Sequence, residues 1–139
     1  MGNSQTVIKL NFEDMKDFIN NPNIHIINTM PDTMQKCLIS GTIPASEEMT
    51  ILNNCLNNVS SYKMIIYGMN STDDKIVKKY NQLISLGFTN VFIYSGGMFE
   101  WLLLQDIFGN DEFPTTSREN DLLKYKGKKI SNRLMITHL

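Results

Sequence analysis

The alternation of short apolar runs with helix-length amphipathic segments is the feature that most constrains this fold. Each run is bounded by polar or turn-forming residues, and the segments between the runs repeat apolar side chains at helical spacing. The runs cover residues 6–10, 24–27, 64–67 and 91–94. Strands that alternate with helices form right-handed crossovers. We therefore predict an α/β sandwich around a mostly parallel sheet.

Helix start and stop signals agree with this pattern. Asn11 and Asp14 have the spacing of a capping box. Ser46, followed by two glutamates, is expected to start the next helix. A third helix is expected from Asp74 to Gly87. The side chains expected on the buried helix faces are Met49, Leu52, Cys55 and Leu56, then Ile76, Val77, Tyr80, Leu83 and Ile84.

Composition indicates one globular domain without a general affinity for nucleic acid. The 139 residues, 42% of them hydrophobic, are enough for one core. Thirteen Lys and Arg against 14 Asp and Glu give a net charge of −1, so no overall field attracts nucleic acid. We predict a flexible N-terminus at 1–5, a domain at 6–110 and a basic C-terminal extension at 111–139. The side chains expected to pack part of this extension are Leu122, Leu123 and Tyr125.

The two cysteines, Cys37 and Cys55, indicate a reduced, cytoplasmic protein. They are too few for a disulfide framework and lack the short spacing of a metal or redox pair. Cys55 falls on an apolar helix face, where a free cysteine behaves as a small core residue. His25 and His138 have no partner at ligand spacing, so we predict neither a metal site nor a cofactor. No secretory signal is present, and no apolar stretch reaches the ~20 residues that span a bilayer.

Three segments in order resemble the rhodanese-like domain family. The family's strand ending in Asp-x-Arg, followed by Gly-His-Ile-Pro-Gly-Ala, is similar to residues 26–30, Ile-Ile-Asn-Thr-Met, and 41–45, Gly-Thr-Ile-Pro-Ala. Its central strand and active-site loop are similar to residues 64–74. Its Gly-Phe-x-x-Val strand and Gly-Gly-x-x-x-Trp ending are similar to residues 87–101. The resemblance covers residues 6–108 and implies a three-layer sandwich with helices on both faces, in which Trp101 fills the core.

The active-site loop departs from the family pattern. The resemblance implies that active members place a cysteine directly after the central strand, where its thiolate accepts a sulfane sulfur beside backbone amides and a helix N-terminus. Here that position is Gly68. The loop consists of Gly68, Met69, Asn70, Ser71, Thr72, Asp73 and Asp74. It has no nucleophile at its start, and it lacks the basic residue that commonly closes the family's loop.

Other residues around the loop also differ from the family pattern. Asp73 and Asp74 favour the positive end of a helix dipole, so we expect them to take the place of a bound anion and to repel one. Ser71 or Thr72 is expected to supply the helix-capping oxygen. The residues that stand at the family's Asp, Arg and His positions are Asn28, Met30 and Thr42.

These departures predict a catalytically inactive rhodanese-like domain that acts as a protein-binding or regulatory module. The partner would be a protein that contacts the loop and its neighbouring surfaces. The alternative is a divergent sulfurtransferase that uses Cys37 as its sulfur carrier, because Cys37 follows a strand that ends at the same edge of the sheet as Gly68. Whether the chain is an enzyme stays open at this point.

The two ends of the chain raise a further expectation, attachment to a cytosolic membrane surface. Gly2 and Thr6 satisfy the Met-Gly-x-x-x-Ser/Thr pattern of N-myristoylation. One acyl chain binds a membrane only marginally, and the basic segment from Lys124 to Arg133 could supply the second signal. The alternatives for this segment are a solvated arm or a contact with an acidic partner.

Overall fold

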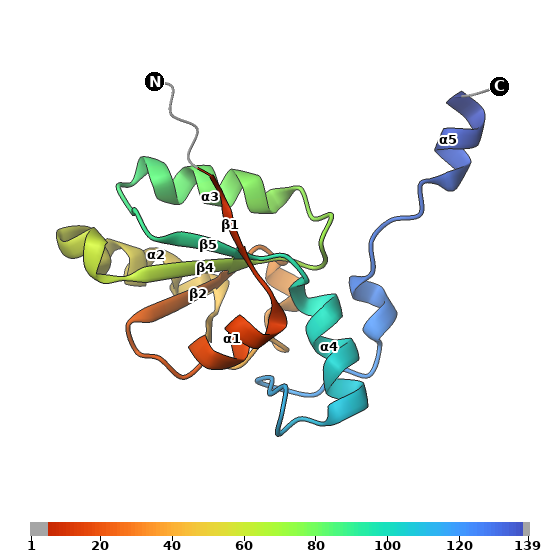
Figure 1. Cartoon of the computed structure of the whole chain (residues 1–139), viewed down its shortest axis with the longest axis horizontal. Coiled ribbons are helices and arrows are strands. Elements are labelled where there is room, and N and C mark those ends of the chain that lie inside the picture. Colours follow the sequence, from red (N-terminus) through yellow and green to blue (C-terminus); the bar gives the residue numbers. More distant parts are fainter. Residues whose placement is uncertain (1–5, 138–139) are drawn as a thin grey trace.

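The protein is described by a computed structural model that covers residues 6–137, and its centre is a five-stranded sheet (Figure 1). The strands are β1 (Ile8–Leu10), β2 (Ile24–Asn28), β3 (Thr42–Ile43), β4 (Lys63–Tyr67) and β5 (Val91–Tyr94). Their order is β1-β5-β4-β2-β3, and every pair is parallel. The sheet is thus entirely parallel, and β4 is its central strand.

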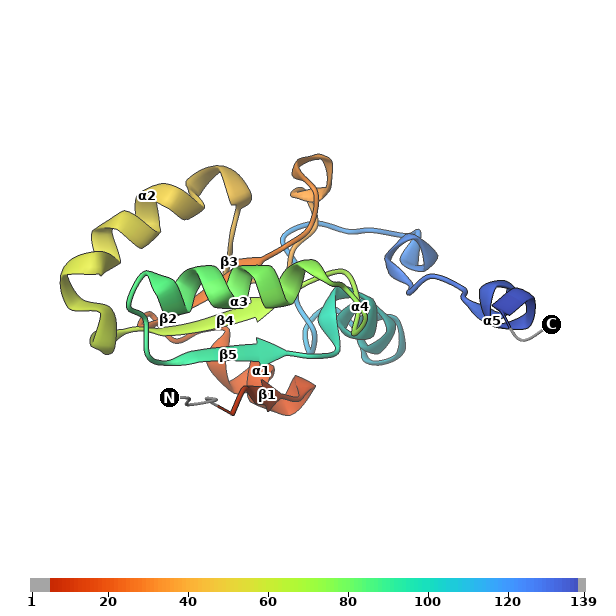
Figure 2. The same cartoon turned by 90° about the horizontal axis from the view of Figure 1, so that it is seen from above.

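Helices cover both faces of the sheet, as the alternation of apolar runs predicts. One face carries α1 (Phe12–Phe18) and α4 (Gly97–Phe108), and the other carries α2 (Ala45–Cys55) and α3 (Lys75–Ser85). Figures 1 and 2 show α3 and α4 on opposite sides of the strands. Three short 3-10 turns complete the domain: η1 (Asp32–Met34), η2 (Leu56–Ser61) and η3 (Leu122–Tyr125).

The central strand β4 divides its side chains between two cores. Ile65 and Tyr67 pack with α1 and α4, whereas Met64 and Ile66 pack with α2 and α3. All four side chains are fully buried. Successive residues of a strand point to opposite faces, so a continuous apolar run is what a strand covered on both faces requires.

Most of the helix boundaries predicted from the sequence are confirmed, but the start of the second helix is wrong. The capping box is present, because Asn11 and Asp14 exchange backbone-to-side-chain hydrogen bonds of 3.0 Å each. The second helix begins at Ala45, after Pro44, rather than at Ser46. The segment after β2 contains the 3-10 turn η1, and Ile39 forms an antiparallel bridge with Thr115.

Three side chains expected on buried helix faces are exposed instead. Leu52 and Cys55 face the core, but Met49 and Leu56 of the same pattern are exposed. Val77 is exposed beside the buried Ile76. A helix turns by about 100° per residue, so only a narrow arc of each of these helices touches the sheet. Apolar residues on the shoulders of that arc remain in contact with water.

The main core continues past residue 110, where the sequence predicts the end of the domain. Phe113 and Tyr125 belong to the same buried cluster as Trp101, and Tyr125 is only 1% exposed. The Trp101 and Phe113 rings meet edge to face with centroids 5.1 Å apart, and Trp101 Nε1 donates to the Pro114 carbonyl at 3.1 Å. Leu123, expected to pack, is exposed.

Beyond Gly127, which lies close to Thr72, the chain leaves the body of the domain. The helix α5 (Ser131–Thr137) projects away from the sheet in both Figure 1 and Figure 2. Over residues 6–137, no helix combines the length and apolar character needed to cross a bilayer.

Candidate functional site

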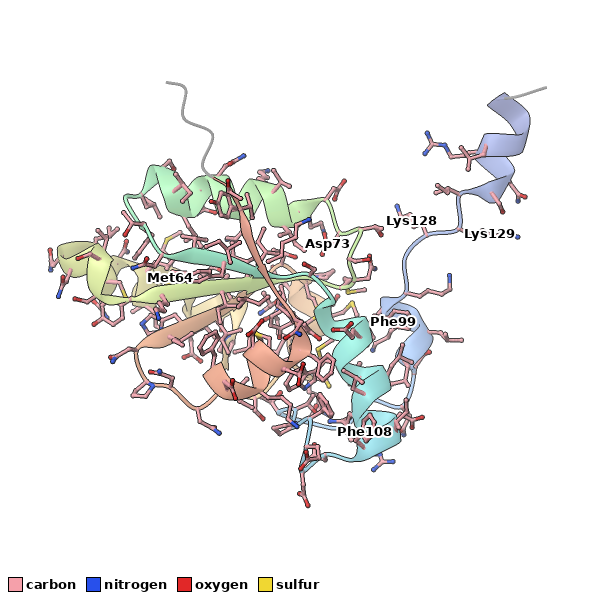
Figure 3. All side chains as sticks on the ribbon, in the orientation of Figure 1. Met64, Asp73, Phe99, Phe108, Lys128 and Lys129 are labelled. Atoms are coloured by element: carbon pink, nitrogen blue, oxygen red, sulfur yellow. The ribbon has the colours of Figure 1, made fainter. Side chains whose placement is uncertain are left out.

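The loop at residues 68–74 lies at the carboxyl end of the central strand. It connects β4 to α3, and the ends of β2 and β5 flank it. In open α/β sheets this edge is where ligands commonly bind. Figure 3 shows Asp73 in this loop, at the start of α3.

The Asp73 carboxylate fills the loop and accepts three hydrogen bonds there. Its Oδ2 accepts from the Thr29 hydroxyl at 2.9 Å and from the Met69 amide at 3.1 Å. Its Oδ1 accepts from the Lys75 amide at 3.0 Å. Asp73 therefore acts as an internal anion, held by a loop amide and by the first amide of α3. Asp74, by contrast, is exposed and makes no side-chain capping hydrogen bond.

The space that a side chain at residue 68 would need is taken by the same carboxylate. An ideal Cβ on Gly68 would lie 2.2 Å from Asp73 Oδ2 and 2.7 Å from Thr29 Oγ1. Both distances are far below van der Waals contact, and both atoms are held by hydrogen bonds. Gly68 therefore supplies no nucleophile, and its lack of a side chain also leaves the space in which the Asp73 carboxylate packs.

The Asn70 side chain links the loop to the C-terminal extension. Its Oδ1 accepts from the Thr72 amide at 2.9 Å and from the Thr72 hydroxyl at 2.7 Å. Its Nδ2 donates to the Tyr125 carbonyl at 2.8 Å. The expectation that Ser71 or Thr72 caps the following helix is wrong. The Thr72 hydroxyl donates to Asn70, and the Lys75 amide at the start of the helix donates to Asp73.

The glycine pair at the start of α4, Gly96 and Gly97, allows that helix to pack closely on the loop. The amides of Met98 and Phe99 donate to the loop carbonyls of Gly68 and Met69 at 2.8 and 2.9 Å. Gly97 has a φ of 69°, and a Cβ there would come within 2.8 Å of the Gly68 carbonyl oxygen. Only glycine fits such a position without strain.

The residues at the family's Asp, Arg and His positions make structural contacts. Asn28 is buried and exchanges hydrogen bonds of 3.0 and 2.9 Å with Gln35. The Asn28 Oδ1 also accepts from the Met30 amide at 3.0 Å. Thr42 and the buried Tyr67 share a hydrogen bond of 2.8 Å between their hydroxyls. The polar side chains of this cluster find their hydrogen-bond partners within the protein, so they stabilise the ends of the strands.

Sequence reasoning misses three of these residues: Thr29, Gln35 and Tyr125. Thr29 lies between two positions that the resemblance singles out, and its place at the end of β2, beside β4, is the signal that could have found it. Tyr125 reaches the site through a contact with Asn70, 55 positions away, and Gln35 reaches Asn28 across the turn η1, seven positions away. The local sequence around either residue contains no corresponding signal.

Cys37 lies beneath the C-terminal extension. It is 5% exposed, and its thiol donates to the Ser117 carbonyl at 3.1 Å. Burial raises the pKa of this thiol. Cys55 belongs to the core on the opposite face of the sheet.

The remaining candidates form no second site. His25 packs against Tyr62 with ring centroids 5.0 Å apart, and burial lowers its pKa. In the part of the chain that the structure covers, no three His, Cys, Asp or Glu side chains are grouped as a metal site would require. Gly2 and His138 lie outside the described residues.

Comparisons with known proteins identify the fold. A scan against protein-family models finds no match, and a search of curated proteins finds none. Among solved structures, the Alr3790 protein from Anabaena sp. is similar, with a TM-score of 0.56 and 18% identity over 93% of this chain and 90% of that one. The single-domain sulfurtransferase RDL2 of Saccharomyces cerevisiae has a TM-score of 0.51 and 16% identity, over 81% of this chain and 100% of that one.

A larger protein contains a similar unit. The structure of an EanB variant in complex with hercynine has a TM-score of 0.61 and 14% identity, over 99% of this chain and 34% of that one. The chain therefore spans about a third of EanB. Together with the all-parallel sheet, these likenesses show that the chain has a rhodanese-like α/β fold.

Proposed function

We propose that this chain is a catalytically inactive rhodanese-like domain that acts as a protein-binding or regulatory module. The observation that carries the proposal is the position of Asp73 Oδ2, 2.2 Å from where a Cβ at residue 68 would lie. Sulfur transfer on this fold needs a thiolate at that point and free amides around it. A carboxylate already accepts the Met69 and Lys75 amides and would repel an incoming anion.

The loop remains well suited to presenting a fixed surface. The loop carbonyls accept hydrogen bonds from amides of α4, and the Asp73 side chain accepts one from Thr29, directly after β2. The Asn70 side chain donates to the Tyr125 carbonyl of the C-terminal extension. A surface that is already ordered binds a partner without a further cost in conformational entropy.

The alternative, a sulfurtransferase that uses Cys37, is weakened by the surroundings of this thiol. A sulfur carrier must be deprotonated and open to a donor molecule. Cys37 is buried under residues 115–117, its hydrogen is donated to Ser117, and its pKa is raised. Each of these conditions favours an unreactive thiol.

A thiosulfate-to-cyanide sulfur-transfer assay tests the proposal. The assay compares the full chain with Cys37→Ser, and an active rhodanese run in parallel shows that the reagents work. We expect no thiocyanate above the protein-free rate from either form. Turnover that Cys37→Ser abolishes would establish the alternative, and turnover that survives the substitution would show another reactive group; both outcomes overturn the inactive module.

The same proposal places the protein in the cytoplasm, with attachment to the membrane surface as an added feature. Lys124 forms an ion pair with Glu119, so Lys126, Lys128 and Lys129 are the basic side chains of the extension best placed to meet anionic lipid. Intact-mass measurement of the protein expressed in eukaryotic cells should show a myristoyl group that Gly2→Ala removes. An unmodified N-terminus would eliminate the lipid anchor and leave the binding module unaffected.

A further inference from the structure

A hollow of about 340 Å³ lies between the loop, the first turns of α4 and the C-terminal extension. Asn70 and Thr72 line it from the loop, and Gly127 lines it from the extension. Phe99, Glu100 and Leu103 line it from α4. Three segments that are far apart in the sequence thus meet around one concave surface.

Apart from Glu100, the wall that α4 contributes is apolar and open to solvent. Phe99 is half-buried, Leu103 is 40% exposed and Ile107 is 69% exposed. These residues are spaced four apart, so they form one stripe along the helix. A single exposed apolar side chain is ordinary, but a row that leads into a hollow is typical of a surface that binds a partner.

The rim formed by the extension is basic. Lys126 and Lys128 flank Gly127, Lys129 follows, and all three are exposed. No ion pair holds any of the three among the residues that the structure describes. Figure 3 shows Lys128 and Lys129 on the extension, on the same side of the molecule as Asp73 and Phe99. Because the whole chain has a net charge of −1, this is a local positive region.

Acidic side chains lie on two other sides of the hollow, whereas the extension has none beyond Asp121. Glu100 lines the hollow from α4 and accepts a hydrogen bond of 2.6 Å from the Tyr94 hydroxyl, and Asp73 and Asp74 follow Thr72 in the loop. Asp106 lies on α4 near Leu103 and Ile107, toward the end of the stripe away from Gly127. The surface therefore has a direction, with positive charge on the side of the extension and negative charge on the loop and on α4.

We propose that this hollow binds a segment of a partner protein that carries a large apolar residue next to a run of acidic residues. The apolar side chain would rest on Phe99 and Leu103, and the acidic residues would meet Lys126, Lys128 and Lys129. This inference rests on the proposed function and adds to it the place where the partner binds and the partner's chemistry. Apolar burial supplies affinity, and charge complementarity supplies orientation and selectivity.

Selection from a phage-displayed library of random peptides, each of about a dozen residues, tests the chemistry of the partner. The immobilised full chain should enrich peptides that carry an aromatic or branched aliphatic residue beside two or more acidic residues. Enrichment of basic peptides, enrichment without a shared acidic pattern, or no enrichment at all would overturn the proposal.

Variants then test the place of binding, with fluorescence anisotropy of one enriched peptide as the measurement. We expect Leu103→Asp, and separately Lys128→Glu with Lys129→Glu, to weaken binding about tenfold. The matched controls are Val77→Asp, an exposed apolar residue on α3, and Lys9→Glu with Lys78→Glu, which make the same change of charge elsewhere. Equal effects of control and test variants would show that the hollow is not the site.

Two other occupants of the surface are distinguished in the same series. Sedimentation velocity that shows a dimer lost on Leu103→Asp would assign the stripe to a second copy of this chain. Co-sedimentation with vesicles of equal parts phosphatidylserine and phosphatidylcholine, lost on Lys128→Glu with Lys129→Glu and without peptide enrichment, would assign the rim to lipid. Either result overturns the proposed partner, whereas the inactive module itself fails only if the sulfur-transfer assay shows turnover.

Discussion

At the scale of single residues, Gly68 and Asp73 depend on each other. The carboxylate takes the volume that any side chain at residue 68 would need, and its three hydrogen bonds keep it there. The sequence shows the missing nucleophile and the excess of negative charge directly. It does not show that Thr29 is the third partner, because that contact joins residues 44 positions apart.

A double-mutant cycle measures this dependence. We expect Gly68→Ala to lower the free energy of unfolding by about 1–3 kcal/mol, because the added methyl group must displace a bonded carboxylate. The same substitution should cost less in an Asp73→Ala background, where the volume is empty. Urea unfolding measures both costs. Equal costs in the two backgrounds would contradict the coupling, and Asp74→Ala serves as a control for loss of an exposed aspartate.

Replacing the glycine with cysteine should not create a sulfurtransferase. In Gly68→Cys the new thiol competes for space with the Asp73 carboxylate, and this negative charge raises the pKa of the thiol while opposing an anionic substrate. We expect no thiocyanate formation above the protein-free rate in the thiosulfate assay. Titration with a thiol reagent under native and denaturing conditions would confirm that the new cysteine is present and folded into the loop. Turnover by this single variant would show that Asp73 does not block the site.

At the scale of the elements, periodicity identifies the four longer strands and the three helices between them, because each buries a continuous face or stripe. The two-residue edge strand β3 is too short to show a periodicity of its own. The exposure of the Met49 and Val77 side chains is not predictable in this way, because it depends on how each helix lies on the sheet. The contact between Asn70 and Tyr125 is likewise a product of tertiary packing.

The contact between His25 in β2 and Tyr62, just before β4, makes stability depend on pH through His25. Burial beside Tyr62 lowers the pKa of His25 from its usual 6.5. The imidazole therefore binds a proton less readily in the folded protein than in the unfolded chain. The unfolded state then binds more protons in this range, and the free energy of unfolding falls as the pH drops below 6.5. Urea unfolding at about pH 7.5 and about pH 5.5 measures this effect. Between the two pH values, the free energy of unfolding should decrease less for His25→Gln than for the wild type. An equal decrease would mean that His25 does not contribute.

At the scale of the whole molecule, the C-terminal extension is part of the same core as the sheet. Phe113 and Tyr125 close the cluster around Trp101, and the Tyr125 carbonyl anchors the functional loop. The composition of residues 111–139 indicates only a basic segment, because lysines dominate it. Two aromatic residues within a polar segment give little indication in the sequence that the segment is buried. In the structure, both side chains belong to the core.

Truncation of one aromatic side chain tests this integration. We expect Tyr125→Ala to lower the free energy of unfolding by about 3–5 kcal/mol and to shift the entire transition, since the side chain is 1% exposed. Leu123→Ala, two residues earlier and exposed, should change it by no more than about 0.5 kcal/mol. A separate early transition for Tyr125→Ala, with the main one unmoved, would show that the extension folds independently.

The burial of Phe113 and Tyr125 also has a consequence for the order of events during synthesis. Domains fold as units while the chain emerges from the ribosome. Here the sheet is complete at Tyr94, yet the layer that covers Trp101 is completed only by Phe113 and Tyr125, further along the chain. A nascent chain stalled before residue 113 would expose this indole face, so the interval between the synthesis of Tyr94 and that of Tyr125 is when the growing chain most needs protection by chaperones.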